Sequence, residues 1–522
     1  MPTALLIGIL VAGIIVLTPL ADRLRVPFPV VLTVFGLLVP LLPSVPVLRV
    51  DPDIILPLVL PPLLFAATQR ATARDFQENA RPILLLAVGL TLASAAAVAV
   101  LAHQQGLGWG PAVVLGAVVA PPDPVAATAV ARRLRLPGRL VTVLEGEGMF
   151  NDATALVLYE MAVLAVVAGG ISAGELGLSL VLAVVVGVGL GIASGWVTRV
   201  AMARLHAASA ETTLTIAVPF AAYVAADRLH GSGVLAVLAL GLYLRTYGHA
   251  AITSEGWLLG RAVWRYADYL ITAFVFVFIG FELTEVLRTS PERTRALSLA
   301  AWTCAVLVVV RFVWVLAATL RTRRSSRRGP MPLGGREAVV TSWAGMRGVV
   351  TVATALALPL YADDGSTFPG RDTIVVVALV TVLVTLVVQG LTLAPLVSWL
   401  EVGTTSDARA EARELRRGAT EAVLAALEDG LGDPVPDRVR EAVTLQYRGY
   451  LAAQQAIVTA THGEADDDDD PGDDPEVQRL LAAASEVERG FVVDARLQGD
   501  VSPEAADEVL DEVERRALRD LG

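Results

Sequence analysis

The sequence lacks most of the residues that carry charge or form cross-links in soluble proteins. It contains one cysteine and no lysine, and only 18% of its residues are charged, against 55% that are hydrophobic. Cys304 cannot form an internal disulfide and lies in an apolar run, so neither redox chemistry nor a cysteine metal site is expected. Soluble domains carry about 25% charged residues. Together with a mean hydropathy of +0.62, this composition predicts a membrane protein.

The few charges are unevenly distributed along the chain. Residues 1–400 consist mainly of apolar runs of about 17–25 residues, the length that crosses a bilayer, whereas residues 401–522 are densely charged. Much of the net charge of −11 lies in this second region, so it does not indicate nucleic-acid binding. We predict a transmembrane region over 1–400 and a helical, acidic tail over 401–522, with a disordered linker near 464–475.

We count about thirteen spans, with twelve or fourteen as alternatives. Arginine is concentrated in the loops that follow odd-numbered spans, which the positive-inside rule places in the cytoplasm. This puts the N-terminus outside and the tail inside. The N-terminal run has no basic segment and no cleavage site, so we expect it to be the first span. The predicted spans lie near residues 4–20, 27–43, 53–67, 82–102, 111–131, 141–168, 174–197, 212–227, 232–247, 266–284, 298–320, 337–360 and 373–400.

Two of these spans contain residues that interrupt a helix. The fifth contains APPDP at residues 120–124, and three prolines in four residues cannot lie in one unbroken helix. The twelfth contains GMRG at 345–348, with the charge of Arg347 at mid-span. Interruptions in corresponding spans of two inverted six-helix repeats mark the substrate site of secondary transporters. The sequence therefore predicts an all-α polytopic membrane protein with two inverted repeats and a cytosolic helical domain after them.

The sixth span carries two carboxylates and an amide. A carboxylate near the bilayer centre costs about 2.5–3.5 kcal/mol, so Glu147 and Asp152 each need a partner or a function. Asn151 lies close to the face of Glu147, whereas Asp152 is turned about 140° from it, so we assign the two acids different roles. Asp152, beside a broken helix, can hold either a cation or a proton. Glu147 is predicted to form a structural ion pair with Arg347, because each would be costly to bury alone.

Alternatives stay open for three further charged residues. Asp123, between the halves of the fifth span, can compensate the positive end of a half-helix or contact an ion directly. Glu145 lies near the cytoplasmic end of its span and is predicted to be solvated or to line a funnel. Arg311 can pair with an acid in the core or extend toward the inner membrane surface.

The sequence GEGMFNDATAL at residues 146–156 resembles the Asn-Asp signature of NhaP-type and animal NHE-type sodium/proton exchangers. Three other segments are similar to motifs of this family in the same order, namely LPPLLF at 60–65, DPVA at 123–126 and WAGMRG at 343–348. The resemblance covers roughly residues 1–400. It implies a 13-helix fold with a core ion-binding domain, a dimerisation domain and an elevator-like movement.

For the site, the resemblance implies that Asp152 alternates between a proton and the transported cation, that Asn151 makes exchange electroneutral, and that Glu147 pairs with Arg347. The partners it implies are monovalent cations, protons, the lipid bilayer and a second copy of the chain. It further implies a location in the cell membrane, a role in pH and cation homeostasis, and neither a cofactor nor enzymatic activity.

The sequence departs from the family at Ala66, Pro122 and Gly148, where many relatives have an acid, a threonine and a serine. Hard cations prefer oxygen ligands, so three candidate oxygens are missing. The remaining candidates are freed backbone carbonyls, Asp123, Thr154 and water. Sodium is the expected ion, with potassium or lithium as alternatives.

Two other classes of function were weighed against exchange. A cation channel would line a continuous pore with rings of carbonyls or charges, rather than depend on one titrating acid. A membrane-embedded hydrolase would need a nucleophile, a base and an orienting group, and no convincing set is present. We therefore predict antiport by competition of cation and proton for Asp152, with a channel as the alternative.

Overall fold

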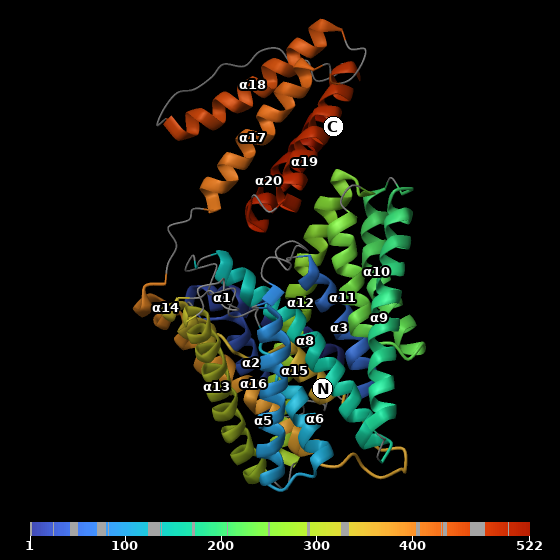
Figure 1. Cartoon of the computed structure of the whole chain (residues 1–522), viewed down its shortest axis with the longest axis vertical. Coiled ribbons are helices and arrows are strands. Elements are labelled where there is room, and N and C mark those ends of the chain that lie inside the picture. Colours follow the sequence, from blue (N-terminus) through green and yellow to red (C-terminus); the bar gives the residue numbers. More distant parts are fainter. Residues whose placement is uncertain are drawn as a thin grey trace.

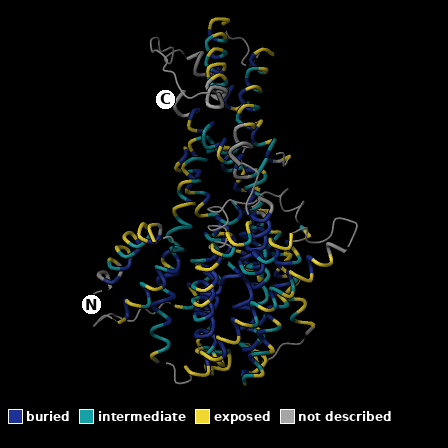
Figure 2. Tube along the Cα trace, turned by 90° about the vertical axis from the view of Figure 1, so that its left-hand side faces the viewer, coloured by how far each residue is buried: buried dark blue, intermediate teal, exposed yellow. Residues whose placement is uncertain are grey.

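The chain is helical through almost all of the residues that the computed structural model describes (Figure 1). An apolar bundle forms the larger part, and the four helices α17 to α20 lie at one end of it. Buried residues run through the interior of the bundle, while exposed positions lie along its outer helices (Figure 2). The described residues are 3–521 apart from 25, 42–50, 70–79, 82, 124–135, 137, 170–172, 206, 249–250, 290–292, 325–333, 403–407, 430, 432–435, 460–474 and 499–500.

Every predicted span contains at least one helix. The first six spans contain α1 (Thr3–Leu24), α2 (Phe28–Leu38), α3 (Pro52–Thr68), α5 (Thr91–Gln104) after a π-helical segment (Leu85–Leu90), α6 (Trp109–Val119) and α8 (Gly138–Val167). The later spans contain α9 (Ala173–Met202), α10 (Ala208–Arg228), α11 (Gly233–Tyr247), α12 (Ser254–Thr289), α13 (Arg293–Arg324), α14 (Gly335–Trp343), α15 (Val349–Leu356) and α16 (Arg371–Leu400). Within the described residues, six helices, including α9, α13 and α16, are long and apolar enough to cross a membrane.

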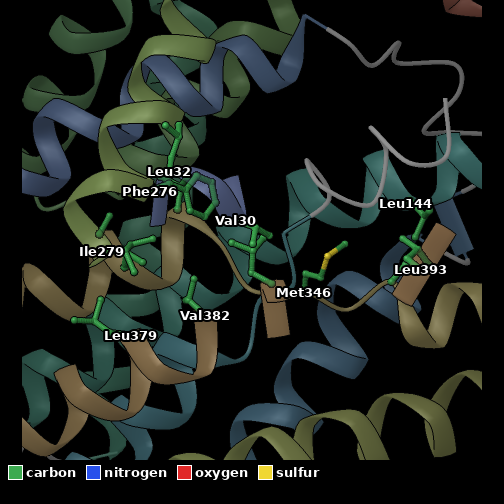
Figure 3. Packing of buried hydrophobic residues seen from close by; sticks show 14 of the residues in the cluster. Val30, Leu32, Leu144, Phe276, Ile279, Met346, Leu379, Val382 and Leu393 are labelled. Atoms are coloured by element: carbon green, nitrogen blue, oxygen red, sulfur yellow. The ribbon is translucent and has the colours of Figure 1, made fainter. Parts of the chain in front are cut away.

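The predicted break in the twelfth span is present, and the helix of the fifth span ends where predicted, while residues 124–135, which include the expected second half of the fifth span, lie outside the described residues. Helix α6 ends at Val119, just before two prolines that lack the N–H needed to continue it. In the twelfth span, residues 344–348 are non-helical and separate α14 from α15. Figure 3 shows Met346 on this segment within the buried hydrophobic cluster, which also contains Val30 and Leu144. The interruption therefore lies inside the protein, where its free backbone groups can find partners.

The bundle divides into two groups of helices that pack mainly with one another. One group, which we call the crossing bundle, contains both interruptions and consists of α5, α6, α8, α13, α14, α15 and α16. The other, the second bundle, consists of α1, α2, α3, α9, α10, α11 and α12. Helices α3, α11 and α12 also touch the crossing bundle, so the interrupted helices lie against a wall formed by the second bundle.

The tail contains four amphipathic helices, namely α17 (Ala408–Glu428), α18 (Asp437–Thr459), α19 (Pro475–Gln498) and α20 (Pro503–Leu521). Two apolar clusters hold them together, one around Tyr447 and Val443 and one around Val509 and Leu510. The second cluster also includes Trp257 of α12. Helix α12 begins at Ser254, well before the expected start at residue 266, because its polar first turns pack against α20 rather than ending at the bundle.

Candidate functional site

The two interruptions meet backbone to backbone. The amide N–H of Asp123, just after α6, donates a hydrogen bond of 2.6 Å to the carbonyl oxygen of Met346, between α14 and α15. Segments more than 200 residues apart in the sequence therefore cross at the point where both helices are open. This crossing is the centre of the candidate site, because unpaired helix ends there can bind charged groups.

Arg347 caps the C-terminal end of α6. Its Nε donates to the carbonyl of Val119 at 3.0 Å, its Nη2 donates to the carbonyl of Ala120 at 3.2 Å, and its Nη1 donates to Gly345. The last carbonyls of a helix carry its negative dipole end, so a buried guanidinium is well placed there. The N–H of Arg347 in turn donates to Thr385 Oγ1 of α16 at 3.1 Å. The side chain is 2% exposed and is held on all sides by the backbone of the crossing.

Asp123 occupies the matching position at α15. A Cβ atom built on Gly348, the residue before α15, would lie 1.5 Å from Asp123 Oδ2, so the carboxylate stands directly at the N-terminus of that helix. A negative charge there offsets the positive end of the α15 dipole. Each interrupted span thus supplies the charge that the other requires. This is the geometry of dipole compensation, and direct contact of Asp123 with an ion stays a prediction.

The predicted ion pair between Glu147 and Arg347 is wrong. Glu147 instead pairs with Arg311 of α13 through two hydrogen bonds, one from Nη1 to Oε1 and one of 2.8 Å from Nη2 to Oε2. Arg311 Nε also donates to the carbonyl of Thr341 near the end of α14, at 3.0 Å. The sequence offered two buried arginines. Arg347 is not Glu147's partner because its donors are taken by carbonyls of the crossing.

Asn151 and Thr154 make backbone contacts only, within the described residues. Asn151 Nδ2 donates to the carbonyl of Pro122 at 3.1 Å, and its Oδ1 is buried without a hydrogen-bond partner. Thr154 Oγ1 donates to the carbonyl of Phe150 at 2.9 Å, within its own helix. Residues two apart on a helix are turned about 200° from each other, so Thr154 faces away from Asp152. The orphan Oδ1 of Asn151 is the better placed oxygen for a cation.

Asp152 differs from the other buried charges of α8. In the part of the chain that the structure describes, its carboxylate accepts no hydrogen bond and forms no ion pair. The charged group that acts on it electrostatically is Asp123, another acid. An acid without a donor or cation partner is costly in a membrane interior. A cation or a proton at Asp152 would remove that cost.

Two further acids, Glu145 and Glu211, lie on α8 and α10. Glu145 is half-buried and lies two residues before Glu147 on α8, on a different face of that helix. Glu211 of α10 was missed by the sequence analysis. It is fully buried and accepts hydrogen bonds from the N–H and the hydroxyl of Thr253, at 3.2 and 2.9 Å, ahead of α12. In the sequence, Glu211 is an acid in the first turn of an apolar helix. Such a position does not tell a buried acid from a solvent-exposed one.

The oxygens near the crossing are suited to a small cation. The carboxylates of Asp152 and Asp123, the Oδ1 of Asn151 and the carbonyl of Pro122 come from two segments that meet there, helix α8 and the residues after α6. Hard monovalent cations favour such ligands. A helical bundle with two interrupted helices crossing beside one unclaimed carboxylate defines a secondary ion transporter.

Comparison with known proteins identifies the family. The family described as "Sodium/hydrogen exchanger, transmembrane" matches residues 8–399, and the chain belongs to it. It is 35% identical over 427 residues to an uncharacterized Na(+)/H(+) exchanger of Mycobacterium tuberculosis, covering 80% of this chain and 78% of that protein. It is 29% identical over 426 residues to the low-affinity Na(+)/H(+) antiporter NhaS1 of Synechocystis, with the same two coverages.

Solved structures support the fold. The sodium proton antiporter MjNhaP1 of Methanocaldococcus jannaschii superposes with a TM-score of 0.61 at 18% identity. The match covers 78% of this chain and 100% of that structure. At this identity the likeness concerns the fold, and it agrees with the helical bundle described above.

Proposed function

We propose that the protein exchanges sodium ions for protons across a membrane, with Asp152 as the site for which the two compete. The observation that carries this proposal is the unclaimed Asp152 carboxylate beside the crossing, in a chain of the sodium/hydrogen exchanger family. One carboxylate must lose its proton before it binds a cation. Competition for one site therefore couples the two fluxes without any further device.

The remaining residues of the crossing have supporting roles in this proposal. Asn151 Oδ1 and the carbonyl of Pro122 complete the oxygen set around the ion, and Asp123 adds a second negative charge. Glu147 with Arg311 holds α8 against α13, while Arg347 holds the open end of α6. Alternating access follows from movement of the crossing bundle against the second bundle, as in other transporters built from two repeats.

We place thirteen helices in the membrane, with two inverted repeats, spans 1–6 and 8–13, joined by α9. The pairing of α6 with α14 and α15 as interrupted helices supports this arrangement. The N-terminus is assigned to the outside and the tail to the cytoplasm, in the cell membrane, on the distribution of arginine. Residues 1–400 form the transporting part and residues 401–522 the acidic tail. A homodimer is proposed from family resemblance alone.

Ion selectivity is the least constrained part of the proposal. Few side-chain oxygens reach the site, because Ala66, Pro122 and Gly148 supply none and Thr154 faces away from Asp152. A cation bound there keeps part of its water. Sodium is the proposed ion, and potassium and lithium are to be compared with it directly.

The test uses purified protein in lipid vesicles that contain a pH-sensitive dye. Sodium, lithium or potassium is added outside, with and without a fixed membrane voltage. We expect proton movement that depends on the cation and is unaffected by voltage. Vesicles without protein give the background. A current driven by voltage, without proton movement, would contradict exchange and indicate a channel.

A further inference from the structure

Helix α8 carries a further acid beyond the crossing, Glu160, which the proposed exchange reaction does not use. Glu160 is half-buried and lies about 12 Å further along the axis of α8 than Asp152. Within the described residues it forms no ion pair with an arginine, and the charged group that acts on it is Asp227 of α10, another acid. Two neighbouring carboxylates repel each other unless a cation or a proton lies between them. Glu160 is therefore a second acid of α8 that lacks a balancing charge.

The hydroxyl of Ser232 faces this acid. Ser232 occupies the N-cap of α11, where a serine side chain usually accepts a hydrogen bond from the first turn of its helix, but it makes no such bond. In the part of the chain that the structure describes, its Oγ is buried without a hydrogen-bond partner, and the residue is 1% exposed. Glu160 is the acid on which this hydroxyl acts. The two groups thus approach each other without completing a hydrogen bond, which leaves their oxygens free to contact a third group.

The groups around Glu160 belong to both bundles. Glu160 lies on α8 of the crossing bundle, whereas Asp227 and Ser232 lie at the end of α10 and the start of α11 in the second bundle, and α8 packs against α11. Tyr223 of α10 is buried beside them: Glu160 acts on it electrostatically, and its ring would lie 2.8 Å from a Cβ built on Gly233. Asp227 is exposed, so an ion can reach these groups from the end of the bundle.

The tail helices lie at the opposite end of the bundle from these groups (Figure 1). Asp507 Oδ1 of α20 is 3.2 Å from Arg245 Nη2 in the last turn of α11, and Asp511 Oδ1 is 2.7 Å from Arg261 Nη1 of α12. We call these contacts the tail docking surface. Ser232 lies about 20 Å from Arg245 along the axis of α11. With the tail in the cytoplasm, as proposed above, Glu160 and its neighbours lie toward the outer side of the membrane.

We propose that Glu160, Asp227 and Ser232 form a second cation-binding site, at the outer end of the interface between the two bundles, that binds sodium before it reaches Asp152. This inference rests on the proposed exchange function. Carboxylate and hydroxyl oxygens are the ligands that hard monovalent cations favour, and paired acids raise the local concentration of cations. Because the ligands belong to both bundles, movement of the bundles separates them, so the site binds the ion in one state of the transport cycle only.

The first test measures binding, so that it does not depend on transport. Purified Asp152→Asn protein, which lacks the proposed exchange site, is titrated with radioactive sodium in a scintillation proximity assay, with size-exclusion chromatography to verify folding. We expect this protein to keep saturable sodium binding, and we expect Asp152→Asn combined with Glu160→Gln to lose it. Sodium binding that is the same in both proteins, or absent from both, overturns the second site.

The second test measures how exchange in vesicles depends on sodium concentration. Glu160→Gln is expected to raise the half-saturating sodium concentration roughly three- to ten-fold, with a much smaller change in the rate at saturating sodium, because the site supplies binding. Glu160→Asp keeps the carboxylate and is expected to recover most of this loss. An unchanged half-saturating concentration in Glu160→Gln, in a protein that exchanges ions, overturns the second site and leaves the proposed function standing.

The matched control is Asp363→Asn. Asp363 is an exposed acid at the same end of the bundle, where its N–H donates to the carbonyl of Val167, the last residue of α8, at 3.2 Å. Its substitution changes the charge of this end by the same amount as Glu160→Gln and removes none of the three proposed ligands. This control is expected to keep the parent half-saturating concentration. An equal shift in both variants would show that general surface charge governs the sodium dependence, and would overturn the proposal.

Discussion

The crossing and the tail docking surface both depend on buried arginines, but they differ in how completely their acids are neutralised. At the docking surface, Asp507 and Asp511 are each bound by arginine. At the crossing, Glu147 is bound by Arg311, while Asp152, five residues later, is bound by no arginine within the described residues. Carboxylates that are paired with arginine hold neighbouring helices together. An acid left without a partner is available for a ligand, and this difference supports Asp152 as the proposed exchange site.

The largest expected effect is at Asp152. If Asp152 is the site as proposed, Asp152→Asn removes both the charge for the cation and the group for the proton, so exchange should fall to the level of vesicles without protein. The measurement is dye-reported proton movement on addition of sodium, with size-exclusion chromatography to verify folding. Thr154→Ala is the control, since that hydroxyl bonds to its own helix and exchange should persist. A folded Asp152→Asn protein that still exchanges ions refutes the site.

The next effect concerns the stability of the crossing. Glu147→Gln or Arg311→Met alone leaves one buried charge unpaired and should cost about 3–5 kcal/mol. The double variant removes both charges and should recover much of this loss, as measured by thermal unfolding in detergent. Glu147→Gln combined with Arg347→Met should recover nothing, because Arg347 binds carbonyls. Recovery in that second pair, and not in the first, would restore the original pairing hypothesis.

The smallest effect is the pH dependence of docking. Burial alone would raise the pKa of Asp507, but Arg245, Arg496 and Arg261 outweigh it and hold the pKa below its usual value. A lowered pKa means that the contribution to docking is complete above the ordinary pKa of an aspartate and is lost only as pH falls through the lowered value. Protease protection of the tail should therefore be constant between about pH 5 and pH 9. A change between pH 6 and pH 8 would show that another group controls docking.

Much of the fold could be predicted from the sequence because long apolar runs and prolines act locally. The interruptions at 120–124 and 345–348 follow directly from residues that cannot continue a helix. Asp152 and Asp123 could be selected from the sequence because charge inside an apolar run is rare, and Asn151 because it precedes Asp152 in the Asn-Asp signature.

The partners of buried charges could not be predicted in the same way. Two arginines, Arg311 and Arg347, were available for Glu147, and the choice depends on which carbonyls the crossing leaves free. That is a matter of three-dimensional packing between distant segments. The docking of the tail on α12 is likewise invisible in hydropathy, because its contacts are arginine–aspartate pairs far apart in the sequence.

Arg347 at the end of α6 and Asp123 at the start of α15 also determine the charge balance at the crossing. At the crossing, Arg347 and Asp123 are opposite in charge, as are Arg311 and Glu147, which leaves the carboxylate of Asp152 without a balancing charge among these five residues. A sodium ion or a proton on Asp152 brings that total to zero in the same way. Without a bound sodium ion or proton, Asp152 keeps its negative charge, and moving that charge through the low-dielectric membrane interior is costly. Both bound forms are neutral at this position and avoid that cost. In the proposed mechanism, this barrier disfavours movement of the transporter without a bound ion or proton and so limits leakage.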